Sequence, residues 1–372
     1  MSVCIAGMGW ITPLGRGVDA TWNRLLGGDE SIAQTISRGE NAKKYEAFLV
    51  PAERLNNLPP HPRLRRASAI SRFAAAAGLD AMAEAKAIRP PIDMTKLALV
   101  FAVSNGGVTY TKRFYQGIVE SGAQSASPIL FPETVFNAPA SHLAAILGID
   151  GATYTIVGDA AVGILAIKMA ADLVDANTVD YCLVVAAEEA DWVLCDAYRK
   201  WRLTKPSPPI ELFSDPPRGT ILSEGAGAVL LGREGKVKLD SIDAGGNFTH
   251  QRNAAEIVRR ILRDVRGQAN CVIASANGTF VDLAERESLI KEMPDSVVYS
   301  PKAALGESVG AGALWQVIVA AQAVDKGQLP PMPHGAESAG LRFPGSATPF
   351  GPSAVVLTCG LNQQAAGLRL SI

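Results

Sequence analysis

The sequence predicts an α/β protein in which layers of helix and sheet are built from two similar halves. Apolar segments of strand length alternate with helical segments along the whole chain, a pattern typical of α/β layers. A short pattern also recurs, because Gly158 to Gly163 and Gly306 to Gly310 each place a glycine and an acid before a long apolar helix. Of the 372 residues, 48% are hydrophobic and 19% are charged, which is enough apolar material for a large core. We expect an N-terminal half, 1–235, and a C-terminal half, 236–372, related by a pseudo-dyad with both helix N-termini directed at one centre.

The elements expected in the first half follow from apolar runs and from helical spacing. A helix is predicted over 18–26, for example, because Trp22, Leu25 and Leu26 share a face and Gly27 follows as a cap. In chain order we expect a strand at 3–8, helices at 18–26 and 68–87, strands at 97–103 and 153–157, a long helix ending near 174, and strands at 181–187 and 226–231.

The second half has the same style. Ile257, Ile261 and Leu262 lie on one face of a predicted amphipathic helix whose other face carries arginines. In chain order we expect a strand at 237–242, that helix at 253–265, a strand at 271–275, helices at 281–292 and 309–324, and strands at 354–359 and 368–372. Two proline-rich loops, at 205–217 and 328–352, either line a site or an interface or are surface excursions.

Composition and spacing exclude several classes of function. The 35 basic and 36 acidic residues nearly cancel, so the basic footprint of a nucleic-acid-binding protein is absent. The five cysteines form no CxxC pair and the four histidines are scattered, which argues against a metal site and favours reduced, buried thiols. The apolar stretch at 310–324 is too short to span a bilayer, and the N-terminus lacks the basic region of a signal peptide. We therefore expect a cytoplasmic globular protein.

Five short motifs occur in a specific order along nearly the whole chain. They are Ile5 to Gly9 with Thr12 to Gly15, Asn137 to Ala140, Ser223 to Gly227, Lys302 to Gly306, and Pro349 to Pro352. This order and spacing resemble the β-ketoacyl synthases of fatty acid and polyketide assembly, members of the thiolase-fold superfamily. The resemblance implies a thiolase-like fold with two βα halves in an αβαβα arrangement, and it implies no cofactor.

The resemblance also assigns two residues to the pocket. Phe350 falls in the segment that is similar to the family's Gly-Phe-Gly-Gly gating loop, although Pro349 and Pro352 would stiffen such a loop and favour a phenylalanine that only fills the core. Lys302 resembles the family's pocket lysine, and it is alternatively expected to pair with Glu224 or Glu307.

The catalytic positions of the family are all changed. A working synthase needs a cysteine activated at a helix N-terminus and two histidines that stabilise an enolate. The resemblance places the cysteine at Ala160, the first histidine at Asn277 and the second at Glu307. Loss of all three groups argues against condensation, because neither an acyl-enzyme nor the enolate would be supported.

Three hypotheses about function follow. The first is a chain-length-factor-like subunit, not catalytic by itself, that pairs with an active ketosynthase and shapes its acyl tunnel in polyketide, aryl-polyene or fatty-acid-type synthesis. The second is a stand-alone thioester hydrolase or decarboxylase, with Asn277 as oxyanion donor and Asp159 or Glu307 as general base. A simpler explanation of both acids is that they cap helix N-termini. The third hypothesis is a homodimeric acyl-binding scaffold.

Two features bear on partners. The stretches 137–147 and 164–173 are apolar and rich in small residues, which suits a close obligate interface on the order of 2,000 Å² with a ketosynthase. The dense basic stretch suits steering of an acidic acyl carrier protein, or it is simply a solvated helix entry. Its cationic residues are His61, Arg63, Arg65, Arg66 and Arg72.

Overall fold

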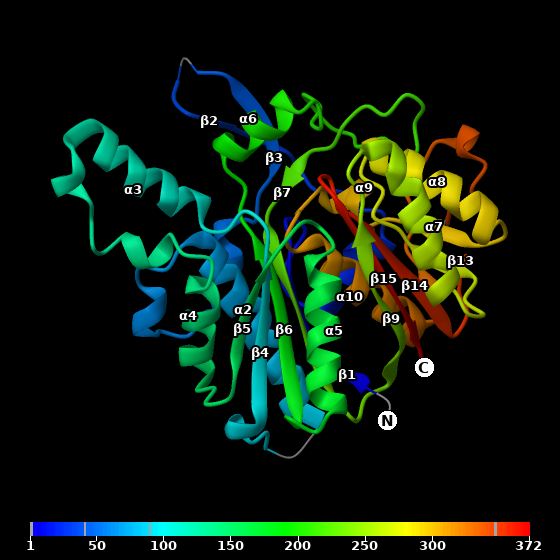
Figure 1. Ribbon diagram of the computed structural model, residues 1–372, viewed down its shortest axis with the longest axis horizontal. Coiled ribbons are helices and arrows are strands. Elements are labelled where there is room, and N and C mark those ends of the chain that lie inside the picture. Colours follow the sequence, from blue (N-terminus) through cyan, green and yellow to red (C-terminus); the bar gives the residue numbers. More distant parts are fainter. Residues whose placement is uncertain (1–2, 41, 89–90, 346–347) are drawn as a thin grey trace.

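Ten strands of the chain form one mixed sheet, seen in a computed structural model that describes residues 3–40, 42–88, 91–345 and 348–372 (Figure 1). The strands are β1 (Val3–Ile11), β4 (Leu97–Val103), β5 (Thr153–Val157), β6 (Tyr181–Glu188), β8 (Gly225–Gly232), β9 (Val237–Asn247), β10 (Cys271–Ile273), β11 (Val297–Tyr299), β14 (Ser353–Cys359) and β15 (Gln364–Ser371). Their order across the sheet is β11-β10-β14-β15-β9-β1-β8-β6-β4-β5.

The sheet consists of two five-stranded units with the same topology. In β5-β4-β6-β8-β1 and in β11-β10-β14-β15-β9, the strands of each unit taken in chain order lie as third, second, fourth, fifth and first. The second, third and fourth strands of each unit pair in parallel, and the fifth runs antiparallel to both of its neighbours. The recurring glycine–acid pattern therefore belongs to a repeated topology. Because β1 pairs with β9 over Val3 to Ile5 and joins the units, a division into domains at 235/236 stays a prediction.

Helices cover the sheet units on both faces and complete five layers. In the middle, α5 (Val162–Asp175) and α10 (Gly312–Lys326) pack on each other and against strands of both units (Figure 1). A side chain at Gly163 would place its Cβ only 2.8 Å from that of Ala313, so glycine permits this close packing. The outer layers are α2 (Ala69–Ile88) with α4 (Ala138–Leu147) on one side, and α7 (Ala254–Val265) with α8 (Phe280–Glu292) on the other. The predicted αβαβα arrangement is confirmed.

Several elements were not expected from the sequence. The helix α3 (Val108–Ser121) protrudes beside the first unit and has no buried residue, although Phe114, Tyr115, Ile118 and Val119 recur at helical spacing (Figure 1). The other short elements are α6 (Trp192–Lys200), α9 (Lys302–Leu305), β2 (Gln34–Ser37), β3 (Lys44–Phe48), β7 (Leu222–Ser223), β12 (Gln328–Leu329) and β13 (Thr348–Pro349). The helix α1 (Val18–Leu26) has the predicted limits. The predicted loop 328–352 contains two of these strands, and its residues 346–347 lie outside the described ranges.

The described residues contain no helix that is both long and apolar enough to cross a bilayer. They also contain no group of three or more His, Cys, Asp or Glu side chains able to hold a metal ion. All five cysteines are described, and each is a buried free thiol. Burial raises the pKa of Cys182 and of Cys195 to about 12, so these thiols are neutral and unreactive.

Candidate functional site

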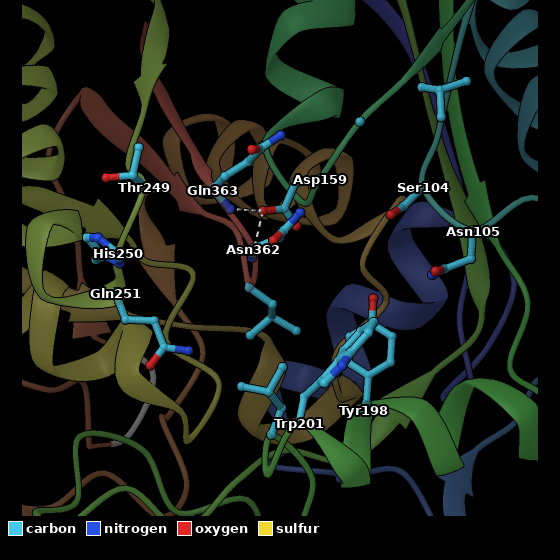
Figure 2. Close-up of a pocket in the computed structure, with 14 residues that line it drawn as sticks. Ser104, Asn105, Asp159, Tyr198, Trp201, Thr249, His250, Gln251, Asn362 and Gln363 are labelled. Carbon is cyan, nitrogen blue, oxygen red and sulfur yellow. Dashed lines mark hydrogen bonds between the residues drawn. The ribbon is translucent and has the colours of Figure 1, made fainter.

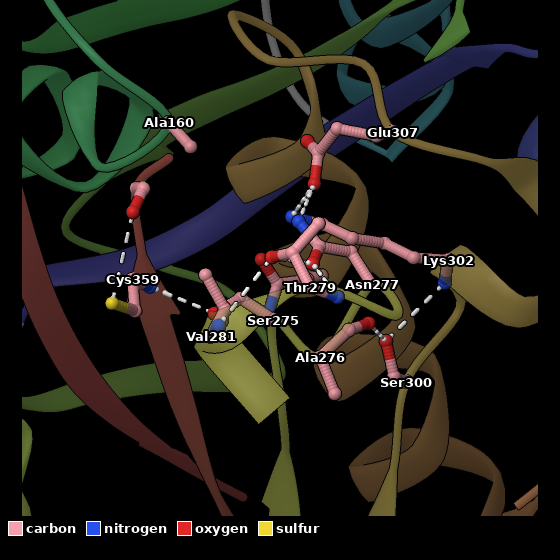
Figure 3. A network of polar contacts seen from close by, with 12 residues as sticks. Ala160, Ser275, Ala276, Asn277, Thr279, Val281, Ser300, Lys302, Glu307 and Cys359 are labelled. Carbon is pink, nitrogen blue, oxygen red and sulfur yellow. Dashed lines mark hydrogen bonds and ion pairs between the residues drawn. The ribbon is translucent and has the colours of Figure 1, made fainter. Parts of the chain in front are cut away.

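The beginnings of α5 and α10 and the loop after β10 surround one buried centre (Figure 3). Ala160, two residues before α5, is 1% exposed and offers only a methyl group there. The cysteine drawn in the same view, Cys359, has its Sγ 3.8 Å from the carbonyl oxygen of Gly360. Burial raises the pKa of the Cys359 thiol well above its ordinary value. The centre therefore holds no thiolate that could accept an acyl group.

A buried trio of polar side chains occupies the other side of this centre. Asn277 and Glu307, the two histidine positions, are 0% and 1% exposed, and Lys302 is 2% exposed. The Nδ2 of Asn277 donates to Oε2 of Glu307 at 2.6 Å, and the Nζ of Lys302 donates to the same oxygen at 2.7 Å. The Oδ1 of Asn277 accepts from the Oγ1 of Thr279 at 2.6 Å. We call Asn277, Lys302 and Glu307 the buried trio.

The contacts of the buried trio restrain its chemistry. Lys302 pairs with Glu307, whereas Glu224 accepts hydrogen bonds from backbone N–H groups elsewhere. The carboxylate of Glu307 contacts the ammonium of Lys302 at 2.7 Å, and a carboxylate, which only accepts hydrogen bonds, offers no donor to a developing enolate. The amide nitrogen of Asn277 is directed at that carboxylate. The trio thus forms a neutral structural unit, which differs from a set of donors aimed at a substrate oxygen.

The second oxygen of Glu307 lies at the start of α10. Its Oε1 has no hydrogen-bond partner among the described residues, and a Cβ placed on Gly312 would lie 3.6 Å from it. The positive end of the helix dipole stabilises a carboxylate at this position. The charge of Glu307 is therefore balanced by Lys302 on one side and by the helix on the other.

Asp159 is turned toward a different partner. Its Oδ1 accepts from the N–H of Ala160 at 2.8 Å, and its Oδ2 accepts from the N–H groups of Asn362 and Gln363 at 2.9 and 3.0 Å. The carboxylate lies so close to Gly360 that a Cβ there would be 1.9 Å from Oδ2. Asp159 therefore clamps the turn between β14 and β15 onto the beginning of α5. Its lone pairs are used by three backbone N–H groups, which fits a capping role better than that of a general base.

An open cavity lies beside this turn and is separate from the buried trio. Its volume is about 980 Å3, and its walls include Asp159 but neither Ala160 nor any member of the trio (Figure 2). Tyr198 and Trp201 form one side, with ring centroids 5.4 Å apart. Leu361 from the clamped turn also lines the cavity. The turn held by Asp159 thus stands between the cavity and the buried centre.

Further buried carboxyl groups hold the loops around the centre, and the sequence analysis missed them. Burial raises the pKa of Asp282 to about 6, although its carboxylate accepts from the N–H of Asn277 at 2.7 Å. Burial raises the pKa of Glu285 to about 7, where it accepts from the N–H and Oγ of Ser275. Glu188 follows the same rule, with a pKa raised to about 8. The available signal was an acid placed directly at the end of an apolar run, as in Ala187-Glu188.

Glu188 links the two units across the centre. Its Oε2 accepts from the N–H groups of Ser104, Asn105 and Gly310 at 3.3, 3.2 and 3.1 Å. Ser104 and Asn105 follow β4 of the first unit, whereas Gly310 precedes α10 from the second. The carboxyl group therefore fixes the entry of a middle helix relative to the opposite half, although no cation pairs with it in the described residues.

The structure does not bring Phe350 to the centre. Phe350 lies three residues before β14, whereas the N–H of the last residue of this strand, Cys359, donates to the Oγ of Ser275 beside the centre at 2.7 Å. A seven-residue strand is roughly 20 Å long, so the aromatic ring lies at the far end of β14, where it packs half-buried against the core. The expectation of a gate at Phe350 is wrong for this reason. The segment beside Asp159 is the turn 360–363, which has Leu361 and no aromatic residue.

The basic stretch lies on the surface before α2. Arg63, Arg65 and Arg66 are exposed, and none of them makes an ion pair with another described residue. The Tyr110 hydroxyl of α3 donates to the carbonyl oxygen of Arg66 at 2.9 Å. The stretch is therefore hydrogen-bonded to the protruding helix α3, and none of its residues contacts the buried trio through a hydrogen bond.

A known family matches this chain over most of its length. The family described as "Beta-ketoacyl synthase, N-terminal domain" matches residues 1–236. The chain belongs to the β-ketoacyl synthase family. Among curated family members, 3-oxoacyl-[acyl-carrier-protein] synthase 2 of Vibrio cholerae is 22% identical over 366 residues, covering 88% of this chain and 87% of that protein. A putative polyketide beta-ketoacyl synthase 2 of Streptomyces coelicolor is 23% identical over 375 residues, covering 89% of this chain and 84% of that protein.

Solved structures of ketosynthases share the whole fold. The ishigamide ketosynthase/chain length factor matches with a TM-score of 0.87 at 18% identity, covering 100% of this chain and 98% of that chain. A ketosynthase in complex with its chain length factor from Xenorhabdus doucetiae matches with a TM-score of 0.85 at 18% identity, with the same coverage. The thiolase-like fold expected from the sequence is confirmed. This ketosynthase-like chain keeps the family's frame around Ala160 and the buried trio.

Proposed function

We propose that this chain is a non-catalytic, chain-length-factor-type subunit of a β-ketoacyl-ACP synthase complex. The single observation that carries the proposal is the buried trio: Lys302 and Asn277 both donate to Glu307, opposite the methyl group of Ala160. The synthase frame is intact while its nucleophile and its enolate donors are replaced by a neutral, closed cluster. A structural role in acyl elongation would explain why the synthase fold is kept although the groups that perform the condensation are replaced.

The edge of the sheet offers a surface for the partner. The last strand, β5, pairs only with β4 among the described strands, and Tyr154 and Val157 on it are 38% and 49% exposed. Unpaired edge strands are templates for pairing with another chain. Neighbouring segments add exposed apolar side chains, namely Tyr115, Val119, Ile129, Phe131, Val135 and Phe136. We propose that β5 and these side chains, called the edge surface, contact an active ketosynthase and close one end of its acyl tunnel.

The two stretches expected at the interface contribute mainly to the core. On α4, Ala138, Ala140 and Leu143 are buried, and the helix packs on α2. On α5, most residues are buried, and only one side remains partly open as a shallow groove of about 350 Å3 lined by Leu165, Met169 and Leu173 among others. The interface proposal therefore rests first on the edge surface and second on this groove.

Co-expression with the active ketosynthase encoded nearest to this chain tests the proposal. We expect a stable heterodimer in size-exclusion chromatography and native mass spectrometry. Val157→Lys, which places a charge on the edge surface, is expected to abolish the complex. Ile290→Lys is the matched control, because Ile290 is 43% exposed on α8 in the opposite outer layer. A homodimer that ignores the ketosynthase, or equal effects of the two variants, would overturn the proposal.

An acidic acyl carrier protein is a further proposed partner. Exposed arginines without ion pairs raise the association rate of an acidic protein through electrostatic steering. We expect Arg63→Glu with Arg66→Glu to slow association of the carrier with the assembled complex, and the effect to shrink at high salt. Arg252→Glu, which reverses another exposed arginine, is the control. No change in the association rate would remove the carrier from this surface.

The hydrolase and decarboxylase hypotheses receive less support from the geometry. Both require Asn277 as an oxyanion donor and Asp159 or Glu307 as a base. In the structure, Asn277 and Glu307 bind each other, and Asp159 accepts three backbone N–H groups. Neither acid is therefore poised to remove a proton.

A further inference from the structure

A separate cavity lies in the segment that leads into α2. It has a volume of about 540 Å3 and is formed by residues between Leu55 and Arg72. Its apolar walls are Leu55, Leu58, Leu64 and three prolines, Pro59, Pro60 and Pro62, and its polar lining is Asn56, His61, Arg65 and Arg72. We call this cavity the arginine pocket. None of these residues belongs to the buried trio, the edge surface or the cavity beside Asp159.

The charges of the arginine pocket are of one sign. Arg65 and Arg72 line it, no carboxylate does, and neither arginine makes an ion pair with another described residue. A contrasting cavity at the start of β1 contains Lys236 and Lys326, but both of these pair with Asp325 at 3.5 and 3.6 Å. Guanidinium groups are weakly hydrated and bind carboxylates and phosphates through two parallel hydrogen bonds. The pocket thus presents uncompensated donors suited to an anion.

The neutral tautomer of His61 adds a third donor. Its Nδ1 accepts a hydrogen bond from the N–H of Arg63 at 3.2 Å. Because Nδ1 is the acceptor, the neutral ring carries its proton on Nε2. His61 therefore presents an N–H donor on the ring edge that is not used by the backbone.

The apolar walls indicate a ligand that has more than an anionic group. Leu55 is 8% exposed, and Leu58 and Leu64 are partly buried beside it. The three prolines have fixed φ angles and no N–H donor, so they form a stiff wall. Burying an aliphatic chain on such a wall is favourable because it removes apolar surface from water.

We propose that the arginine pocket binds an amphiphilic organic anion. A carboxylate or phosphate head binds Arg65 and Arg72 with the help of His61, and an aliphatic chain packs on the leucines and prolines. A volume of about 540 Å3 lies in the usual range of small-molecule sites. This site is independent of the proposed pairing function, because it uses none of the residues that carry it.

Binding to the isolated chain tests the site without a ketosynthase. The probes are octanoate and octyl phosphate as two sources of the head group, octanol as an uncharged match and inorganic phosphate as an anion without a chain. In isothermal titration calorimetry, octanoate or octyl phosphate is expected to bind with a dissociation constant at least about tenfold lower than that of octanol or inorganic phosphate. Equal binding of octanol, or equal binding of inorganic phosphate, would overturn the proposal.

Matched variants locate the ligand. Arg65→Gln with Arg72→Gln is expected to weaken octanoate or octyl phosphate at least about tenfold, because the lost hydrogen bonds involve charged groups. Arg63→Gln is the control, since Arg63 is exposed in the same stretch but does not line the pocket. Leu64→Asn is expected to weaken the octyl ligands and to leave phosphate unchanged. Unchanged affinity in the double variant, with its thermal unfolding unaltered, would contradict the assignment.

Discussion

The two middle helices begin after the same short pattern, yet the two acids of that pattern have different surroundings. Asp159 is partly exposed and accepts three backbone N–H groups, so it clamps the turn 360–363. Glu307 is buried and is held by the ammonium of Lys302 and the amide of Asn277. The difference teaches that a repeated topology places an acid at each helix entry, while the neighbouring loops decide whether it caps backbone or balances a charge.

The largest effect is expected when the charge balance of Glu307 is broken. Lys302→Met leaves the carboxylate buried without its cation, which typically lowers the free energy of unfolding by 3–5 kcal/mol, about the cost of an unpaired buried charge. Urea denaturation measures this change. Lys302→Met combined with Glu307→Gln is expected to recover much of the loss, because no uncompensated charge remains. A single variant as stable as the natural chain would show that Glu307 does not depend on Lys302.

Glu188 shows what a carboxyl group at the entry of α10 does without a cation. Burial raises its pKa from the ordinary value of 4.5 to about 8, so the folded chain keeps a proton that the unfolded chain releases. Stability from this group is therefore full below about pH 4.5 and falls as the pH rises toward 8. In Glu188→Gln, the midpoint of thermal unfolding is expected to depend less on pH between pH 5 and 8. The variant lacks the titrating group that changes the free energy of unfolding by on the order of a few kcal/mol over this range. An identical pH profile in both proteins would contradict this.

Asp159 is expected to have a smaller and more local effect. Asp159→Ala removes the acceptor of the N–H groups of Asn362 and Gln363, with a loss of about 1–2 kcal/mol. Hydrogen exchange is expected to accelerate at these two amides and to stay unchanged in the loop of Asn277. Asp159→Asn, which keeps one acceptor oxygen, should lie between the two. Equal exchange in all three proteins would show that the carboxylate does not hold the turn.

The smallest change in activity is expected at Ala160. Ala160→Cys restores a thiol near a helix N-terminus, but Glu307 still opposes the enolate, and loss of one oxyanion donor alone lowers rates by about 10²–10³. Malonyl-dependent elongation by this variant is expected to stay at background, measured with radiolabelled malonyl carrier protein. Ala160→Cys with Asn277→His and Glu307→His is the comparison. Elongation by the single variant at an ordinary synthase rate would contradict the account of the buried trio.

The sequence predicted elements wherever burial alone determined the pattern. The limits of α1 and β4 agree with the apolar runs, because the inward residues of α1 recur at helical spacing and every residue of β4 is buried. The limits of β5 also agree, although this strand lies at the edge of the sheet and is partly exposed. The helix α3 was missed, since its residues do not pack into the core. Its apolar residues do recur at helical spacing, but Tyr115 and Val119 are 59% and 84% exposed.

The candidate site was predictable in its members and less so in its contacts. Ala160, Asn277 and Glu307 came from the order of motifs, and the pairing of Lys302 was expected with one of two acids, Glu224 or Glu307. Folding decides between them, because Glu224 is surrounded by backbone N–H groups. Phe350 was assigned to the gate because Pro-Phe-Gly-Pro resembles the family's gating motif in sequence. In the structure, the length of β14 separates Phe350 from the centre.

The central claim is that this chain supports acyl elongation without carrying the acyl group. Its most direct test is intact mass spectrometry of the complex of this chain with its active ketosynthase, after incubation with an acyl carrier thioester. We predict an acyl adduct on the ketosynthase and an unchanged mass for this chain. A stoichiometric adduct mapped to residues 155–165 of this chain would contradict the account.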